Sequence, residues 1–235
     1  MTSPEPDFSA MRQSTPARRR HISEFVECEA RADRPLHVLE VGAWTGESAL
    51  CWQAAIVRHC PQGGFVLCVD PWESYASAAD LAGESPIYRH MDALLKSGEA
   101  FDLFRRNIQT DDQQTVPIIW QRGRLTDEAV ALRHQFDIVY LDGSHYLADV
   151  LADIEVARAL VRPGGVLCGD DLEMQGNECD LAVDRALPLV DYVVDHHPGV
   201  TVAVWEAFGE VWSRDGVWAV RRGKDGGYTR YTEDP

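Results

Sequence analysis

The feature that most constrains the fold of this chain is an alternation of short apolar runs with longer segments of helical periodicity. Each run is rich in Val, Ile and Leu and is predicted as a buried strand, at 35–43, 63–72, 115–123, 136–144 and 166–171. Helices are predicted between some of these runs, most clearly at 47–60 and 147–161, and before the first run at 21–32. Because strands that alternate with helices form parallel sheets covered on both faces, the pattern predicts an α/β fold.

The end of the chain breaks this alternation. A helix is predicted over 179–195, followed by two strands at 199–208 and 216–223 with no helix between them. Strands joined without a crossover helix pair in antiparallel fashion. The prediction is therefore a doubly wound, mostly parallel seven-stranded sheet with an antiparallel edge pair.

The chain is predicted to form one domain preceded by an arm. Residues 1–20 are rich in polar residues and Pro, which predicts a weakly ordered arm, and 21–235 are long enough to bury one core. The connection at about 73–104 is unusually long, which favours a lid or a substrate wall. The basic cluster at 18–21 is interpreted as a solvated face, with an arm that folds over a partner subunit or a substrate as the alternative.

Composition excludes several classes of protein. A net charge of -16 argues against nucleic acid as a partner, because phosphate binding needs clustered cations. No apolar run reaches the roughly 18 residues of a membrane span, and no apolar signal region is seen near the N-terminus, so a cytoplasmic protein is expected. The six cysteines show no C-x-x-C spacing, so neither a zinc site nor a disulfide framework is predicted. The sequence leaves the oligomeric state open.

The first strand of the pattern ends in a glycine turn that opens a helix. In "VLEVGAWTG", Gly42 and Gly46 let the backbone approach a ligand at the helix N-terminus. The G-x-x-x-G spacing differs from the dinucleotide fingerprint G-x-G-x-x-G, which disfavours a nicotinamide dehydrogenase. Asp70 ends the second strand, where an acid suits the hydroxyls of a ribose. The combination predicts a nucleoside ligand.

Acidic residues gather at the ends of the later strands. Asp142 follows the fourth strand, and Asp170 and Asp171 follow the fifth. Three adjacent carboxylates would repel one another unless one takes up a proton or a cation binds between them, and hard oxygen donors suit Mg²⁺. In the alternative interpretation Asp142 caps a helix and the acidic pair ends its strand in a solvated turn.

Two blocks of the sequence carry a resemblance to a known family. "VLEVGAWTGESA" with "VLCVDPW" resembles motif I and the acidic second motif of class I S-adenosylmethionine-dependent methyltransferases, which have a Rossmann-like fold. "FDIVYLDGSHYLADVLADIEVARALVRPGGVLCGDDL" resembles the later block of metal-dependent O-methyltransferases, both the catechol type and the sugar enzymes of macrolide and aminocoumarin biosynthesis. The resemblance covers about 36–172.

The resemblance implies roles for individual residues. Glu40, Gly42 and Gly46 would line the methionine part of S-adenosylmethionine, and Asp70 would hold its ribose. The adenine would lie against Trp72, Gly123 and Arg124, although the family often has an acid or serine where Arg124 stands. Trp44 is a further candidate because an aromatic face attracts a sulfonium, with cover over the first helix as the alternative. The metal ligands would be Asp142, Asp170 and Asp171.

The predicted function is Mg²⁺-assisted methyl transfer to a hydroxyl of a small molecule, such as a sugar-bearing natural product, a vicinal diol or a catechol. Asp142 would act through the metal, which lowers the pKa of the attacking hydroxyl. His145 is the candidate base because it closely follows Asp142 and its pKa range suits proton removal; its alternative role is a helix cap. The sugar enzymes place an acid where Ser144 stands, so their base assignment does not carry over. A metal-independent methyltransferase and a non-catalytic nucleoside-cofactor-binding protein remain as alternative functions.

Overall fold

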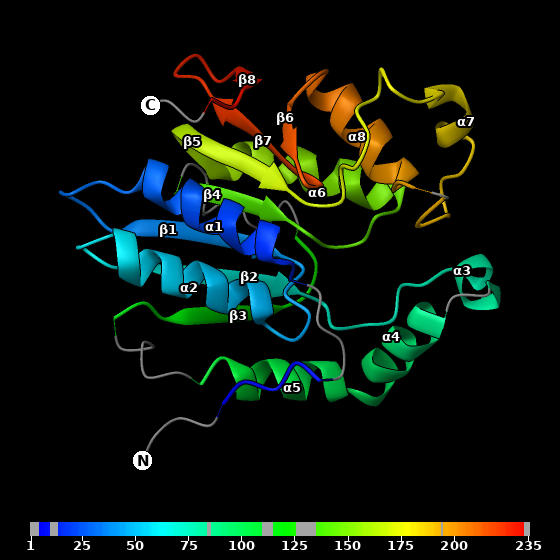
Figure 1. Cartoon of the computed structure of the whole chain (residues 1–235), viewed down its shortest axis with the longest axis horizontal. Coiled ribbons are helices and arrows are strands. Elements are labelled where there is room, and N and C mark those ends of the chain that lie inside the picture. The colour runs from blue at the N-terminus through cyan, green and yellow to red at the C-terminus, as the bar shows by residue number, and fades with distance from the viewer. Residues whose placement is uncertain are drawn as a thin grey trace.

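The computed structural model describes residues 5–9, 14–83, 86–109, 115–125, 135–193 and 195–232. One central sheet has helices on both faces (Figure 1). All five predicted parallel strands form, in the spatial order β3-β2-β1-β4-β5. Their bounds are Leu36–Val41 for β1, Gly64–Asp70 for β2, Ile118–Arg122 for β3, Phe136–Leu141 for β4 and Val161–Gly169 for β5.

Alternate residues of the central strands enter two hydrophobic cores, one on each face of the sheet. Val38, Ile138 and Val166 point into the core shared with α1 (Pro16–Glu29) and α2 (Glu47–His59). Their neighbours Leu39, Val139 and Leu167 point into the core shared with α6 (Leu147–Leu160) and α8 (Pro198–Phe208). Because side chains alternate along a strand, burial on both faces requires the nearly continuous apolar runs seen in the sequence.

The register of the parallel strands brings their carboxyl ends to one edge. Val41 of β1 pairs with Val69 of β2 and with Leu141 of β4, and Leu141 pairs with Gly169 of β5. The residues that follow these four positions therefore lie side by side at that edge. They are Gly42, Asp70, Asp142 and Asp170.

The antiparallel edge has other members than predicted. The run at 199–208 forms helix α8, not a strand, and its core-facing side chains pack against α6. The predicted helix over 179–195 is reduced to α7 (Leu181–Arg185). The edge strands are β6 (Trp212–Arg214), β7 (Val217–Arg222) and β8 (Tyr228–Arg230), with β7 antiparallel to β5. Within the described residues the sheet thus has eight strands instead of the seven predicted.

Part of the predicted arm is helical. Helix α1 begins at Pro16, and the hydroxyl of Thr15 accepts the backbone N–H of Arg18 (3.1 Å), so 16–20 belong to a capped helix. Residues 5–9 run beside α5 (Glu99–Asn107; Figure 1), where Asn107 exchanges hydrogen bonds with the backbone of Asp7 (2.7 and 2.9 Å). The remainder of the arm, 1–4 and 10–13, lies outside the described residues.

The long connection contains α3 (Ala78–Ala82), α4 (Pro86–Ser97) and the start of α5. Helices α3 and α4 project from the sheet on the side of its carboxyl ends (Figure 1). Their role as a lid stays a prediction. Among the described residues, no helix combines the length and apolar character that a membrane crossing requires.

At the opposite end of the strands, a buried ion-pair cluster surrounds Asp137. This side chain is 1% exposed and contacts Arg34 Nη1 (2.7 Å) and Arg162 Nε. Its Oδ2 also accepts the backbone N–H of His37 (2.8 Å). A buried carboxylate needs such partners, so the cluster ties the segment before β1, β4 and β5 together far from the carboxyl ends.

Candidate functional site

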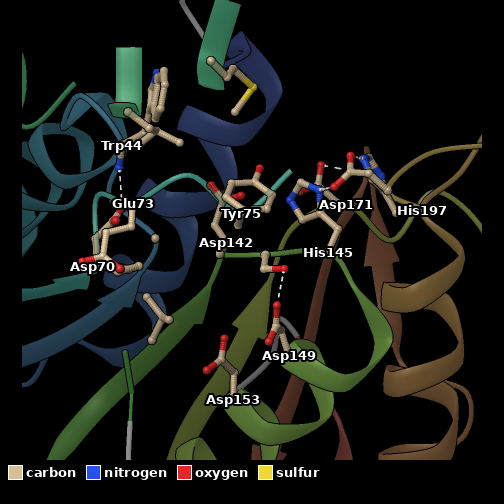
Figure 2. Close-up of a pocket in the computed structure, with 18 of the residues that line it drawn as sticks. Trp44, Asp70, Glu73, Tyr75, Asp142, His145, Asp149, Asp153, Asp171 and His197 are labelled. Carbon is tan, nitrogen blue, oxygen red and sulfur yellow. Dashed lines mark hydrogen bonds and ion pairs between the residues drawn. The ribbon is translucent and has the colours of Figure 1, made fainter. Parts of the chain in front are cut away.

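A cavity of about 920 Å³ opens at the carboxyl ends of the parallel strands. Its walls come from the loops after β1 to β5, from α3 and α4, and from the segment 190–197 (Figure 2). It contains most of the residues that the sequence predicts for a functional site. From the predicted cofactor set these are Gly42, Trp44, Asp70, Gly123 and Arg124, and from the predicted catalytic and metal sets Asp142, His145 and Asp171.

The turn after β1 requires glycine at position 42. Gly42 has a φ of +82°, and a Cβ there would lie 2.5 Å from the carbonyl carbon of Asp142 and still closer to its oxygen. The ends of β1 and β4 touch at this point, as shown by the hydrogen bond from Asp142 N to Val41 O (2.8 Å). The glycine turn therefore places the predicted cofactor loop directly against Asp142.

Asp70 holds the glycine turn from the neighbouring strand. Its Oδ2 accepts the backbone N–H groups of Ala43 (2.9 Å) and Trp44 (3.0 Å; Figure 2), and its Oδ1 accepts that of Trp72 (2.6 Å). Burial raises the pKa of Asp70, while these three N–H donors oppose the rise. Asp70 lines the cavity and also fixes the loop, and its contact with a ribose stays a prediction.

Three residues of the predicted cofactor set lie outside the cavity wall. Trp72 is 1% exposed, packs in the core against Phe101 and Phe104, and donates from Nε1 to Trp44 O (2.7 Å), so it supports the turn instead of flanking an adenine. Gly46 is the N-cap of α2 and lies against Phe104. The third residue is Glu40.

Glu40 is fully buried beneath the turn. Its Oε2 accepts from Cys68 Sγ (3.3 Å), and burial raises its pKa to about 8. The indole Nε1 of Trp44 is buried without a hydrogen-bond partner among the described residues. Because buried polar atoms are normally satisfied and Trp44 lines the cavity, this N–H is a donor available to a polar ligand.

His145 lies between two carboxylates on the other side of the cavity. Its Nε2 contacts Asp171 Oδ2 (3.0 Å), and its Nδ1 contacts Asp191 Oδ1 (3.0 Å). Burial alone would lower the pKa of His145, but Asp171 and Asp191 outweigh it and raise the pKa well above the ordinary value. The His145 ring is therefore held in a fixed orientation, with Nε2 on the side of Asp171.

Arg18 of α1 lies between the acids that end β4 and β5. Its Nη1 is 3.2 Å from Asp142 Oδ2, and its Nη2 forms an ion pair with Asp170. The Arg18 side chain is only 13% exposed and lines the cavity. The interpretation of the basic cluster as a solvated face is thus wrong for Arg18, and Asp170 points to Arg18 instead of joining Asp142 and Asp171 in the cavity wall.

The floor of the cavity carries a second polar group on α6. Asp149 accepts from Ser144 Oγ (2.7 Å; Figure 2) and pairs with Arg124 Nη1 (2.9 Å). One turn later, Asp153 also lines the cavity, and burial raises its pKa to about 7. This group orients Arg124, one of the residues predicted to flank the adenine.

Comparison with known proteins identifies the family of this chain. A sequence profile described as "Methyltransferase domain" matches residues 39–172, which is more than half of the chain. The chain belongs to this methyltransferase family. Membership confirms the resemblance to class I S-adenosylmethionine-dependent methyltransferases that motif I and the later block indicate. A search of curated proteins finds no significant match.

Solved structures show the same fold at low sequence identity. One is apo CalS11, described as a TDP-rhamnose 3'-O-methyltransferase of calicheamicin biosynthesis, with 14% identity, 89% of this chain and 82% of that chain covered, and a TM-score of 0.50. Another is a protein from Corynebacterium glutamicum, with 12% identity, 91% and 83% covered, and a TM-score of 0.50. These likenesses confirm the predicted Rossmann-like fold class.

In the methyltransferase, the three aspartates predicted to bind Mg²⁺ are already paired with basic side chains. Atoms of Asp142, His145 and Asp171 lie within 4.8 Å of one another, close enough for a common ion, but both ring nitrogens of His145 are already bonded. A Mg²⁺ about 2 Å from Asp142 Oδ2 would lie roughly 5 Å from the Arg18 guanidinium. At an effective dielectric constant of about 20 the repulsion is about 7 kcal/mol. With Arg18 in this position, the site does not fit the ion.

Several cavity residues of the methyltransferase carry no signal in the sequence. Asp191 lies in the range predicted as a helix, yet it is 2% exposed and contacts both His145 and Tyr88 Oη (2.6 Å). His197 packs edge-on against His145 with ring centroids 4.6 Å apart. These residues belong to no motif, and only their positions in the fold mark them.

Proposed function

We propose that this protein transfers the methyl group of S-adenosylmethionine to a hydroxyl oxygen of a small molecule. One arrangement supports the proposal: the glycine turn with Asp70 faces a largely buried His145–Asp191 pair across a single cavity. The cavity volume is near the top of the roughly 300–1,000 Å³ range of ligand pockets, which leaves room for a cofactor and a small acceptor. Membership of the methyltransferase family supports the reaction type.

The cofactor half of the cavity is assigned to the residues around the glycine turn. We infer that Gly42 and Trp44 face the methionine part and that Asp70 faces the ribose. Gly123 and Arg124, held by Asp149, would face the adenine. When bound, S-adenosylmethionine supplies an electrophilic methyl group on a positively charged sulfur. The protein must then align an acceptor oxygen with that methyl group and remove its proton.

His145 is the base in this proposal. Asp191 holds Nδ1, so Nε2 is the ring atom that faces the acceptor half of the cavity. In the structure Nε2 contacts Asp171, and an acceptor hydroxyl would take that place and pass its proton to Nε2. Because the pKa of His145 is raised, the fraction of neutral, competent base grows toward alkaline pH.

The lining of the cavity also narrows the acceptor class. Among its described lining residues, eight are acidic and two are arginines. Tyr75, Tyr88 and Tyr192 add aromatic walls on the side of α4 and the segment 190–197. We infer a hydroxylated acceptor without phosphate, such as an uncharged or amine-bearing sugar or aromatic diol, because a phosphate would be repelled by the carboxylates.

None of the six cysteines forms a disulfide bond in the described part of the chain, which supports our proposal of a cytoplasmic location. Mg²⁺ assistance, expected from the sequence, is not part of the proposal because Arg18 lies at the predicted ion position.

Calorimetry with S-adenosylhomocysteine, followed by transfer of a labelled methyl group to a panel of hydroxylated acceptors, tests the proposal. We expect His145→Ala to bind S-adenosylhomocysteine like wild type while losing about 100-fold or more in transfer rate. Cofactor binding with no transfer to any acceptor would favour a non-catalytic binding protein. Full transfer activity in His145→Ala would remove the base from the proposal.

A further inference from the structure

We propose that Arg18 takes the place of a divalent ion at the acidic ends of β4 and β5, so that this methyltransferase works without a metal. The inference deepens the proposed function, since the carboxylates concerned lie beside its acceptor half. Asp142, Asp170 and Asp171 are the residues that the sequence predicts as metal ligands. What differs is the cation that the structure places among them.

The position of Arg18 in its helix shows that the acids hold it there. Arg18 lies in the first turn of α1, where the helix dipole disfavours a positive charge. The same turn carries Arg19 and Arg20, and each of them also pairs with an acid, Glu47 and Asp215 respectively. Only the Arg18 pair reaches the cavity. The carboxylates at the strand ends therefore compensate an unfavourable place in the helix.

Each of the three predicted metal ligands already has a partner. The two terminal nitrogens of Arg18 contact Asp142 and Asp170, one carboxylate each, and His145 contacts Asp171. Arg18 and Asp170 are 13% and 5% exposed, so the pairs are largely shielded from water. Arginine has donors on a rigid planar fork, which suits two carboxylates on neighbouring strands.

The Arg18 guanidinium contributes one fixed positive charge at the edge of the acceptor half of the cavity. Asp142 lies between this charge and the glycine turn, because its carbonyl touches Gly42 and its carboxylate touches Arg18. Arg18 thereby acts as a positioning residue that pairs with Asp142 and Asp170, while a carboxylate oxygen of Asp142 stays within 4.8 Å of one of Asp171. A metal-dependent enzyme would instead draw the three carboxylates onto one ion.

Binding of Mn²⁺ to the full-length protein, followed by electron paramagnetic resonance, tests the inference directly. We expect wild type to show no Asp142-dependent Mn²⁺ binding and Arg18→Gln to bind Mn²⁺ at least about 100-fold more tightly, because the repelling charge is gone. Asp142→Asn in the Arg18→Gln background should abolish the gained binding. Arg20→Gln is the matched control: it removes an exposed arginine of the same turn and should leave Mn²⁺ binding as in wild type.

Two outcomes would overturn the inference: Mn²⁺ binding by wild type that Asp142→Asn removes, or a folded Arg18→Gln protein with no gain in affinity. Binding of S-adenosylhomocysteine reports whether each variant is folded. If Arg18→Gln does not fold, the inference is tested by Mn²⁺ binding to wild type and to Asp142→Asn alone. Transfer activity after EDTA treatment should equal that in Mg²⁺. Failure to find transfer in either condition would count against the proposed function, whereas the Mn²⁺ result would still decide on Arg18.

Discussion

Replacement of Gly42 by alanine should damage the site far more than the same change at another glycine of equal backbone conformation. Gly42 and Gly98 have φ angles of +82° and +80°. An alanine Cβ at position 98 meets nothing within 4 Å, whereas at position 42 it meets the backbone of Asp142. Gly98→Ala should therefore cost only the roughly 1–2 kcal/mol of the left-handed conformation.

The extra cost at Gly42 follows from the distances. Relief of the 2.5 Å approach to the Asp142 carbonyl carbon requires a shift of roughly 1 Å at the ends of β1 and β4. Such a shift would break the 2.8 Å hydrogen bond from Asp142 N to Val41 O, which costs about 1 kcal/mol more. With the lost packing, we expect a total of at least about 3 kcal/mol.

Thermal unfolding and calorimetry measure both effects. One kcal/mol corresponds to about 2–4 °C in a chain of this size, so Gly42→Ala should melt at least about 6 °C below wild type. It should also bind S-adenosylhomocysteine at least about tenfold more weakly, while Gly98→Ala binds normally. If the two variants melted within about 2 °C of each other and bound S-adenosylhomocysteine equally, the close contact between the turn and Asp142 would be refuted.

Three further predictions follow from individual side chains. Asp191→Asn removes a charge that raises the pKa of His145, so the acidic limb of the rate–pH profile should move to lower pH; an unmoved profile would separate Asp191 from the base. Because the pKa of Glu40 is raised to about 8, its contribution to stability is full below about pH 4.5 and is lost as the pH rises toward 8. Glu40→Gln should therefore flatten the pH dependence of the unfolding free energy of the apo-protein in that window by up to about 1.4 kcal/mol per pH unit. An unchanged slope would show that Glu40 is ionised. Asp137→Ala leaves two arginines without their buried partner and should cost about 3–5 kcal/mol in urea unfolding with cofactor affinity per folded molecule intact; a loss below about 1 kcal/mol would contradict the role of the cluster.

The segment 199–208, predicted as a strand, forms a helix because its tertiary contacts override its local sequence preference. Val200, Thr201, Val202, Ala203 and Val204 are all buried, so the run has no polar face that could reveal a helical period. Its β-branched residues favour a strand by propensity, yet Pro198 starts a helix and the packing of α8 against α6 decides the outcome. Propensity is a weak preference that tertiary contacts override.

The sequence alone determined the parallel core of the sheet and the edge that carries the site. Apolar runs with intervening helices specify strands of one direction, and the glycine turn and acids follow those strands directly, so their gathering needs only the parallel register. Only the tertiary structure decided which basic side chain pairs with each of these acidic residues. Arg18 and Asp142 are 124 positions apart, and His145 and Asp191 are 46 apart. Charge pairing over such separations depends on how α1 and the segment after α7 pack, and no local periodicity encodes that packing.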